Sequence, residues 1–226
     1  MPQRLEPFLN NSIYHVFNRT IDHRVIFKIR DSNTNIFMQL LAYYRSLKAA
    51  ISFSKLKITD KKIVENLMNE VSFKKYFKVE IMAFCLMPTH FHFLLRQKTD
   101  EGIPRFISDV LNSFTRYYNI KNKRRGPIFL PKFKSVRILN DEQLKHVSRY
   151  IHLNPYSSSV IENIKDLENY HLSSFKEYLS NNKKRLSNDE FILDLFQKDK
   201  DRYERFVLMN ADYQKTLEFI KHAKKW

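Results

Sequence analysis

The order of the predicted elements indicates an α+β fold, in which one antiparallel sheet carries helices on one face. Three observations predict this class. Two apolar, β-prone runs flank Met87-Pro88-Thr89, further strand-like segments lie at residues 12–19 and about 133–139, and apolar residues recur at helical spacing between the strands. Together they give the order strand, helix, strand, strand, helix, strand.

The first strand is expected at residues 12–19, which are rich in β-branched and aromatic side chains. His15 and Arg19 are polar positions within it, and a half-exposed strand explains them as well as a role in a site does. Asp31-Ser32-Asn33 then supplies N-cap candidates for an amphipathic helix at about residues 33–49.

The central hairpin, at residues 78–96, carries the first candidate site. Proline does not fit a central strand, so the turn is expected at Met87-Pro88-Thr89. Side chains alternate along a strand, which places His90 and His92 on one face and the neighbouring phenylalanines on the other, toward the core. Two adjacent imidazoles can bind one divalent ion, although two histidines at this spacing more often bind none.

A long amphipathic helix is expected at about residues 102–122, followed by a strand at about 133–139. Tyr117 and Tyr118 lie on the apolar stripe of this helix, which favours packing over catalysis. The basic turn at residues 121–127 is either a solvated surface or a phosphate contact.

The last helix of the core is expected to begin at Asn140, with Gln143 completing a capping box, and to end at Pro155. One stripe of its surface consists of His146, Tyr150 and Asn154, which recur every four residues. Packing of the helix on the sheet would therefore bring Tyr150 and Asn154 beside the histidine pair.

Composition limits the class of function. The chain has 226 residues and a formal charge of +16, from 40 Lys+Arg against 24 Asp+Glu, which favours a polyanionic partner such as DNA or RNA. Glycine occurs only at 2 positions, and no phosphate-binding Walker or dinucleotide motif is present. Without a membrane-spanning run or an N-terminal signal core, and with Cys85 as its single cysteine, the protein is expected to be cytoplasmic, near the nucleoid, with no membrane partner.

The element order is that of the ferredoxin-like βαββαβ fold. Several segments resemble the single-tyrosine HUH transposases, and most closely their branch of REP-associated tyrosine transposases. These segments are residues 14–19, 86–92, 133–135, 149–155 and 170–175. HUH denotes two histidines separated by a bulky apolar residue, here His90-Phe91-His92, and the resemblance covers about residues 12–180.

This resemblance implies a metal-dependent enzyme that cleaves and rejoins single-stranded or hairpin DNA during transposition. His90, His92 and Asn154 would bind Mg²⁺ or Mn²⁺. Tyr150 would attack a phosphodiester, form a 5′-phosphotyrosine and release a 3′-OH, because a covalent tyrosyl ester conserves the bond energy for rejoining. The general base is not identified, and His146 is one candidate.

The basic residues near these motifs are expected to contact DNA phosphates. They are Arg19, Arg116, Lys121, Lys123, Arg124, Arg125, Lys132, Lys134 and Arg137. The target DNA, and whether the protein is a monomer or a homodimer, stay open.

A catalytic domain is expected at residues 1–180, with a lysine-rich insertion at 50–77 that contains a capped helix near 60–70, and a helical extension at 181–226. Two alternative functions remain. One is a non-catalytic nucleic-acid-binding module of the same fold, and the other is a metal-dependent phosphodiesterase that uses activated water. The joint presence of the two histidines, the tyrosine and the asparagine favours the transposase over the binding module, and only chemistry separates it from the phosphodiesterase.

Overall fold

The computed structural model describes residues 7–182 and 185–223 and contains a four-stranded antiparallel sheet with the strand order β2-β3-β1-β4. The strands are β1 (Ile13–Arg19), β2 (Val79–Met87), β3 (His90–Gln97) and β4 (Lys134–Ile138). The predicted hairpin is confirmed, because β2 and β3 are joined directly through Pro88 and Thr89. The predicted α+β fold is confirmed as well.

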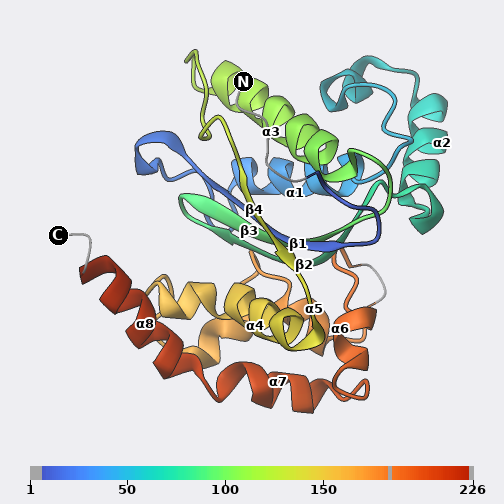
Figure 1. Ribbon diagram of the computed structural model, residues 1–226. Coiled ribbons are helices and arrows are strands. Elements are labelled where there is room, and N and C mark those ends of the chain that lie inside the picture. The colour runs from blue at the N-terminus through green and yellow to red at the C-terminus, as the bar shows by residue number, and fades with distance from the viewer. Residues whose placement is uncertain (1–6, 183–184, 224–226) are drawn as a thin grey trace.

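Helices cover both faces of the sheet, whereas the sequence predicted helices on one face (Figure 1). They are α1 (Ser32–Tyr44), α2 (Lys61–Ser72), α3 (Gly102–Lys121), α4 (Asp141–Ser157), α5 (Phe175–Leu179), α6 (Glu190–Asp194), α7 (Lys200–Leu208) and α8 (Ala211–Ala223). The two helices of the predicted core motif, α1 and α3, lie on one face, and α4 with the C-terminal helices lies on the other.

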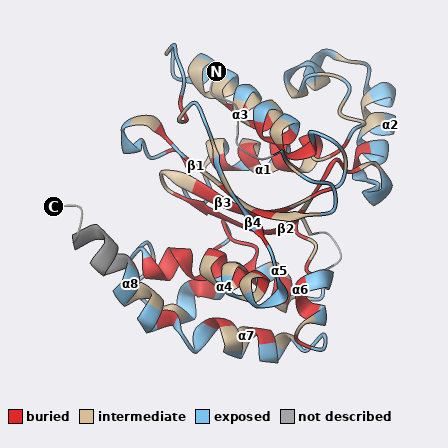
Figure 2. Ribbon diagram, viewed as in Figure 1, coloured by how far each residue is buried: buried red, intermediate tan, exposed pale blue. Residues whose placement is uncertain are grey.

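The alternation along β3 determines which face becomes the main core. Phe91 stacks on Phe93 with ring centroids 4.5 Å apart and lies 5.9 Å from Phe37 of α1, so the phenylalanines point toward α1 and α3. All three rings are fully buried, and burial of each contributes about 1.5–3 kcal/mol. Figure 2 shows buried residues on the strands and on the two helices above them. The histidines of β3 consequently face α4.

The outer edge of β2 is covered by the C-terminal third of the chain. Leu86 N donates to Leu172 O at 2.8 Å, and Ser174 N donates to Phe84 O at 2.9 Å. Further bonds of this kind join Asn188 N to Ile81 O, Tyr170 OH to Leu86 O and Tyr178 OH to Met82 O. The backbone groups along this edge are thereby paired, as buried strands require.

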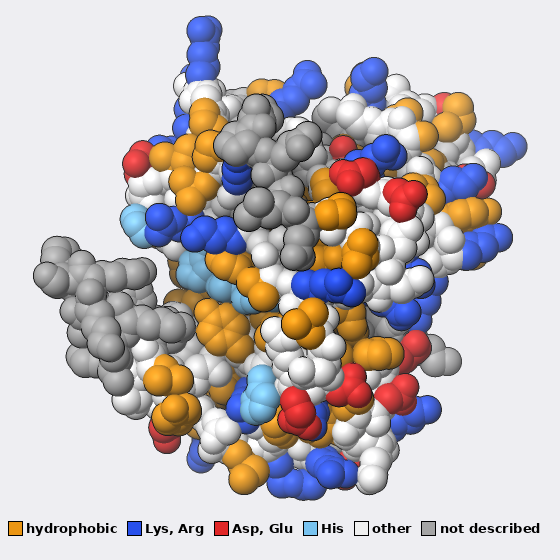
Figure 3. Space-filling model, in the orientation of Figure 1, with side chains coloured by type: hydrophobic (Ala, Val, Ile, Leu, Met, Phe, Trp, Pro, Cys, Tyr) orange, Lys and Arg blue, Asp and Glu red, His pale blue; other side chains and the backbone are white. Residues whose placement is uncertain are grey.

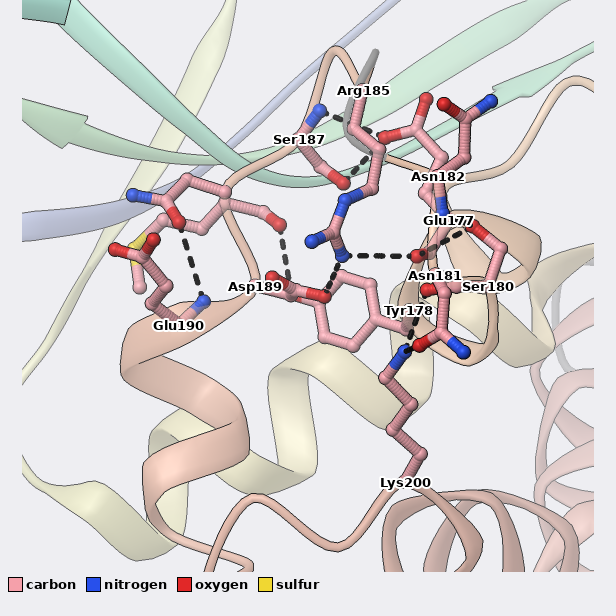
Figure 4. Close-up of polar contacts among 12 residues, drawn as sticks. Glu177, Tyr178, Ser180, Asn181, Asn182, Arg185, Ser187, Asp189, Glu190 and Lys200 are labelled. Atoms are coloured by element: carbon pink, nitrogen blue, oxygen red, sulfur yellow. Dashed lines mark hydrogen bonds and ion pairs between the residues drawn. The ribbon is translucent and has the colours of Figure 1, made fainter.

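A polar cluster fastens the C-terminal helices to one another (Figure 4). The Glu177 carboxylate accepts from Ser187 N at 2.8 Å and from Ser187 Oγ at 2.6 Å. Arg185 forms an ion pair with Asp189, and Lys200 of α7 donates to the backbone oxygen just after α5 at 2.6 Å. The division of the chain at residue 180 stays a prediction, although these contacts run across that point.

Two predicted helix ends differ from the structure. The first helix was expected to reach residue 49, but α1 ends at Tyr44 because the chain turns to form a β-bridge between Ser46 and Phe77. The expectation that Pro155 ends the last core helix is also wrong, since α4 continues to Ser157. Pro155 lacks the backbone N–H and so removes one hydrogen bond of the helix. The helical hydrogen bonding resumes after it, because Ser158 N donates to Asn154 O at 3.0 Å.

Candidate functional site

The histidine pair lies on the sheet face that α4 covers. The ring centroids of His90 and His92 are 5.2 Å apart, with the rings nearly perpendicular. His92 is buried, with 7% of its surface exposed, whereas His90 is partly exposed. Each ring is fixed through Nδ1: that of His90 lies 3.1 Å from Thr89 Oγ1, and that of His92 lies 2.9 Å from His15 Nε2.

Helix α4 places Tyr150 against this pair. The tyrosine ring meets His92 edge-on, with centroids 5.5 Å apart, and meets His15 at 5.8 Å. One turn later, the buried Asn154 donates from Nδ2 to Tyr150 O at 2.9 Å, which fixes the orientation of its amide. The start of α4 is capped as the sequence predicted, because the Asn140 side chain accepts from the backbone N of the third helical residue at 2.8 Å.

The four predicted central residues, His90, His92, Tyr150 and Asn154, line one cleft of about 530 Å³. Three of the predicted basic residues, Arg19, Lys132 and Lys134, line it as well. Figure 3 shows histidine side chains at the level of the sheet, with Lys and Arg side chains beside them. The cleft therefore brings together groups that can bind a metal, a tyrosine hydroxyl and positive charge.

The other predicted basic residues do not line this cleft. Arg116 and Lys121 of α3 line a second cleft on the opposite side of the sheet, and Lys121 Nζ donates to Ser32 Oγ at 2.6 Å. The β1–β4 register pairs Arg137 with Tyr14, and Tyr14 pairs with Leu95, so Arg137 belongs to the sheet face that α1 and α3 cover. Lys123, Arg124 and Arg125 lie in the turn after α3.

His146 does not reach the cleft. Its Nδ1 lies 2.7 Å from Arg149 Nη2 on the surface of α4, and its ring packs near Phe206. Of the three residues in the predicted stripe, Tyr150 and Asn154 face the histidine pair, whereas His146 points away from it. Tyr117 and Tyr118 pack against the apolar core, as expected.

The sequence did not clearly predict that His15 and His23 belong to the site. His15 contacts His92, and burial lowers the pKa of His15 to about 4, so that its ring is neutral at neutral pH. His23 lines the cleft from a turn in which both Asp22 and His23 have positive φ angles. Strand alternation could have placed His15 on the α4 face, but no local pattern indicates that His23 returns to the site.

The donor set of the cleft fits a divalent ion. Imidazole nitrogens from His90 and His92 and the amide oxygen of Asn154 are ligands that Mn²⁺ accepts well and Mg²⁺ accepts less readily. Within residues 7–182 and 185–223, no group of three His, Cys, Asp or Glu side chains could hold a metal, and the third side chain of this donor set is the amide of Asn154.

Across the described parts of the chain, no helix combines the length and apolar character needed to cross a bilayer.

Both the central part of the sequence and the fold of the chain are similar to those of transposases. Residues 52–154, which include the hairpin and the tyrosine of α4, match the model of the family described as IS200-like transposases. The structure of a REP-associated tyrosine transposase bound to a REP hairpin is similar, with a TM-score of 0.53 and 15% identity over 83% of this chain and 91% of that one. No curated protein matches the chain. The resemblance to tyrosine transposases predicted from the motifs is confirmed: residues 52–154 are similar to the IS200-like transposases, and the fold is similar to that of a REP-associated tyrosine transposase.

Proposed function

We propose that the protein cleaves and rejoins single-stranded DNA at a hairpin through a covalent 5′-phosphotyrosine on Tyr150. The observation that carries this proposal is the position of the Tyr150 ring, 5.5 Å from His92 and in the same basic cleft as Asn154. The similar transposase of known structure was bound to a REP hairpin, which supports a hairpin as the substrate.

In the cleavage step, the Tyr150 hydroxyl attacks the phosphorus and the bond from phosphorus to the 3′-oxygen breaks. The phenolic proton is lost to solvent or a base, and the departing 3′-oxygen takes up a proton to become a 3′-OH. Rejoining is the reverse reaction, with a 3′-OH as the attacking group. A phenol has a pKa near 10, so positive charge in the cleft favours its reactive anion.

His90, His92 and Asn154 would hold Mg²⁺ or Mn²⁺ in this cleft. When bound, the ion polarises the phosphoryl oxygens and offsets negative charge in the transition state. Arg19, Lys132 and Lys134 line the same cleft, where they would hold the phosphate backbone near the tyrosine.

Incubation with a hairpin substrate and Mn²⁺ should give a covalent protein–DNA adduct that survives denaturant. Tyr150→Phe should abolish the adduct and keep hairpin affinity within about twofold, because only one hydroxyl is lost and no charge that contacts phosphate changes. Denaturing gels measure the adduct, and peptide mapping should place it between His146 and Asn154. Tyr213→Phe is a matched control, since it removes the same group from an exposed tyrosine of α8.

The outcomes separate the possible reactions. An adduct that persists in Tyr150→Phe would move the nucleophile to another tyrosine. Cleavage by the unaltered protein without any adduct would indicate a phosphodiesterase that uses activated water, and binding without cleavage would indicate a non-catalytic module.

A further inference from the structure

His15 of β1 forms a hydrogen bond with His92 of β3. The distance from His15 Nε2 to His92 Nδ1 is 2.9 Å, and the two rings are stacked at 24° with centroids 5.2 Å apart. The β1–β3 register pairs Phe17 directly with His92 and pairs His15 with Leu94, so His15 reaches His92 along the diagonal between the strands.

The orientation of the His92 ring is determined from several sides. Phe17 stacks on it with centroids 5.6 Å apart, and Tyr150 meets it edge-on. Because His92 is buried, its polar atoms need partners within the protein, and His15 provides one for Nδ1. Packing thus fixes the position of the His92 ring, and the hydrogen bond with His15 bears on which nitrogen of that ring carries the proton.

A hydrogen bond between two neutral imidazoles needs one donor and one acceptor. If the proton lies on His92 Nδ1, that nitrogen donates to His15 Nε2 and the lone pair of His92 lies on Nε2. If His15 donates instead, His92 carries its proton on Nε2, and that nitrogen is unable to bind an ion. The state of the His15–His92 hydrogen bond therefore decides whether His92 is a ligand.

We propose that His15 is a positioning residue that accepts the Nδ1 proton of His92 and so keeps His92 in the tautomer whose Nε2 binds the divalent ion. This role rests on the proposed function, because it requires His92 to be a metal ligand. His90 has a similar arrangement, with Thr89 Oγ1 beside its Nδ1. Partners of this kind orient the ligand and raise its basicity.

The first test measures Mn²⁺ binding to the full chain by electron paramagnetic resonance, in the absence of DNA. His15→Phe keeps a ring of similar size but removes the acceptor, and should weaken Mn²⁺ binding by about 10–100-fold. His15→Gln places an amide oxygen near the position of Nε2 and should restore most of the affinity. His171→Phe is the matched control, because His171 is exposed and does not line the cleft.

The second test reads the tautomer directly in the unaltered protein. Two-dimensional ¹⁵N NMR of the imidazole rings, assigned by comparison with His92→Gln, should show His92 protonated on Nδ1 before metal is added. A purely structural contact does not favour this tautomer over the other. The measurement also remains decisive if His15→Phe does not fold.

The outcomes distinguish the two levels of the proposal. Normal Mn²⁺ affinity in folded His15→Phe, or a His92 ring protonated on Nε2, would overturn the role of His15. If His90→Ala abolishes Mn²⁺ binding in the same experiment, the metal site itself stands. Unchanged Mn²⁺ binding in His90→Ala would overturn the metal site and the role of His15 together.

Discussion

Asn154 shows how one amide can serve both the helix and the cleft. Its Nδ2 donates to Tyr150 O at 2.9 Å, so its oxygen remains to bind an ion. An aspartate would offer the same oxygen but lose this donor, and it would place a charge in a position where 2% of the asparagine surface is exposed. The hydrogen bond also couples the possible ligand to the turn that carries Tyr150.

At the same scale, His90→Ala should abolish metal-dependent cleavage, with a loss of at least about 100-fold, because a direct ligand matters more than the partner of a ligand. The fold should persist, since His90 is partly exposed and lies at the end of β3. Cleavage of a labelled hairpin across a Mn²⁺ titration and thermal unfolding measure the two effects.

His171→Ala is the control, because it removes an exposed imidazole outside the cleft. Full cleavage by the unaltered protein in EDTA would contradict the metal assignment, and so would normal Mn²⁺-dependent cleavage by His90→Ala.

At the scale of the element, α4 is fastened to its surroundings by a buried polar network. His152 is fully buried, with Nε2 located 2.8 Å from Ser174 Oγ and Nδ1 located 2.8 Å from Tyr203 OH. Tyr203 OH donates further to Ser148 Oγ at 3.2 Å. Burial lowers the pKa of His152 to about 3, so the network holds a neutral ring at neutral pH. It connects α4 to α7 and to the segment that covers β2, and thereby holds the helix that carries Tyr150.

Tyr203→Phe should lower the free energy of unfolding by about 1–3 kcal/mol, because it leaves a nitrogen of the buried His152 without its hydroxyl partner. Urea unfolding followed by circular dichroism measures the change. Tyr213→Phe removes the same group from an exposed position of α8 and should change stability by less than about 0.5 kcal/mol. Equal stability in the two variants would show that the network contributes nothing.

The elements that could be predicted are those with a local signal. The proline turn of the hairpin, the apolar stripe of α3 and the Asn140 cap all depend on residues close in sequence, and all were predicted correctly. The end of α1 depends on the bridge from Ser46 to Phe77, which no local pattern encodes. The continuation of α4 through Pro155 depends on whether the helix tolerates the loss of one hydrogen bond.

The residues of the candidate site also divide into those that local patterns predicted and those that they did not. Strand alternation and helical spacing placed the histidine pair, Tyr150 and Asn154 on suitable faces, and the structure brings the four together. The role of His15 stayed open because its neighbour His92 belongs to another strand, and the pairing of β1 with β3 was not predicted. Spacing alone also suggested His146, although the helix turns that side chain toward Arg149.

At the scale of the whole molecule, the net charge of +16 includes basic side chains in the clefts on both sides of the sheet. Lys134 and Arg137 belong to the same strand and are both exposed, yet the register places Lys134 on the face of the cleft and Arg137 on the other face. Composition predicts an anionic partner, whereas only the fold distinguishes the charges that face the proposed cleavage site.

Lys134→Ala should weaken hairpin binding and reduce the slope of log affinity against log salt concentration by about 1, because one phosphate contact is lost. Arg137→Ala removes an equal charge from the other face of the same strand and should change this slope less. Fluorescence anisotropy measures the hairpin affinity of both variants at salt concentrations from about 50 to about 200 mM. Over this range, binding that depends on phosphate contacts weakens steeply. Equal slopes in the two variants would indicate that DNA contacts both faces of β4.

The covered edge of β2 has a consequence for handling the protein. β2 is an apolar strand of 9 residues whose outer backbone groups are bonded to the segment after α4, whereas the opposite edge, β4, has 5 residues and carries Lys134 and Arg137. Short, charged edges resist pairing with another chain, but a long apolar edge invites it. A chain truncated just before Tyr170 would retain every proposed catalytic residue and yet expose this edge, so aggregation would be the expected cause of its inactivity.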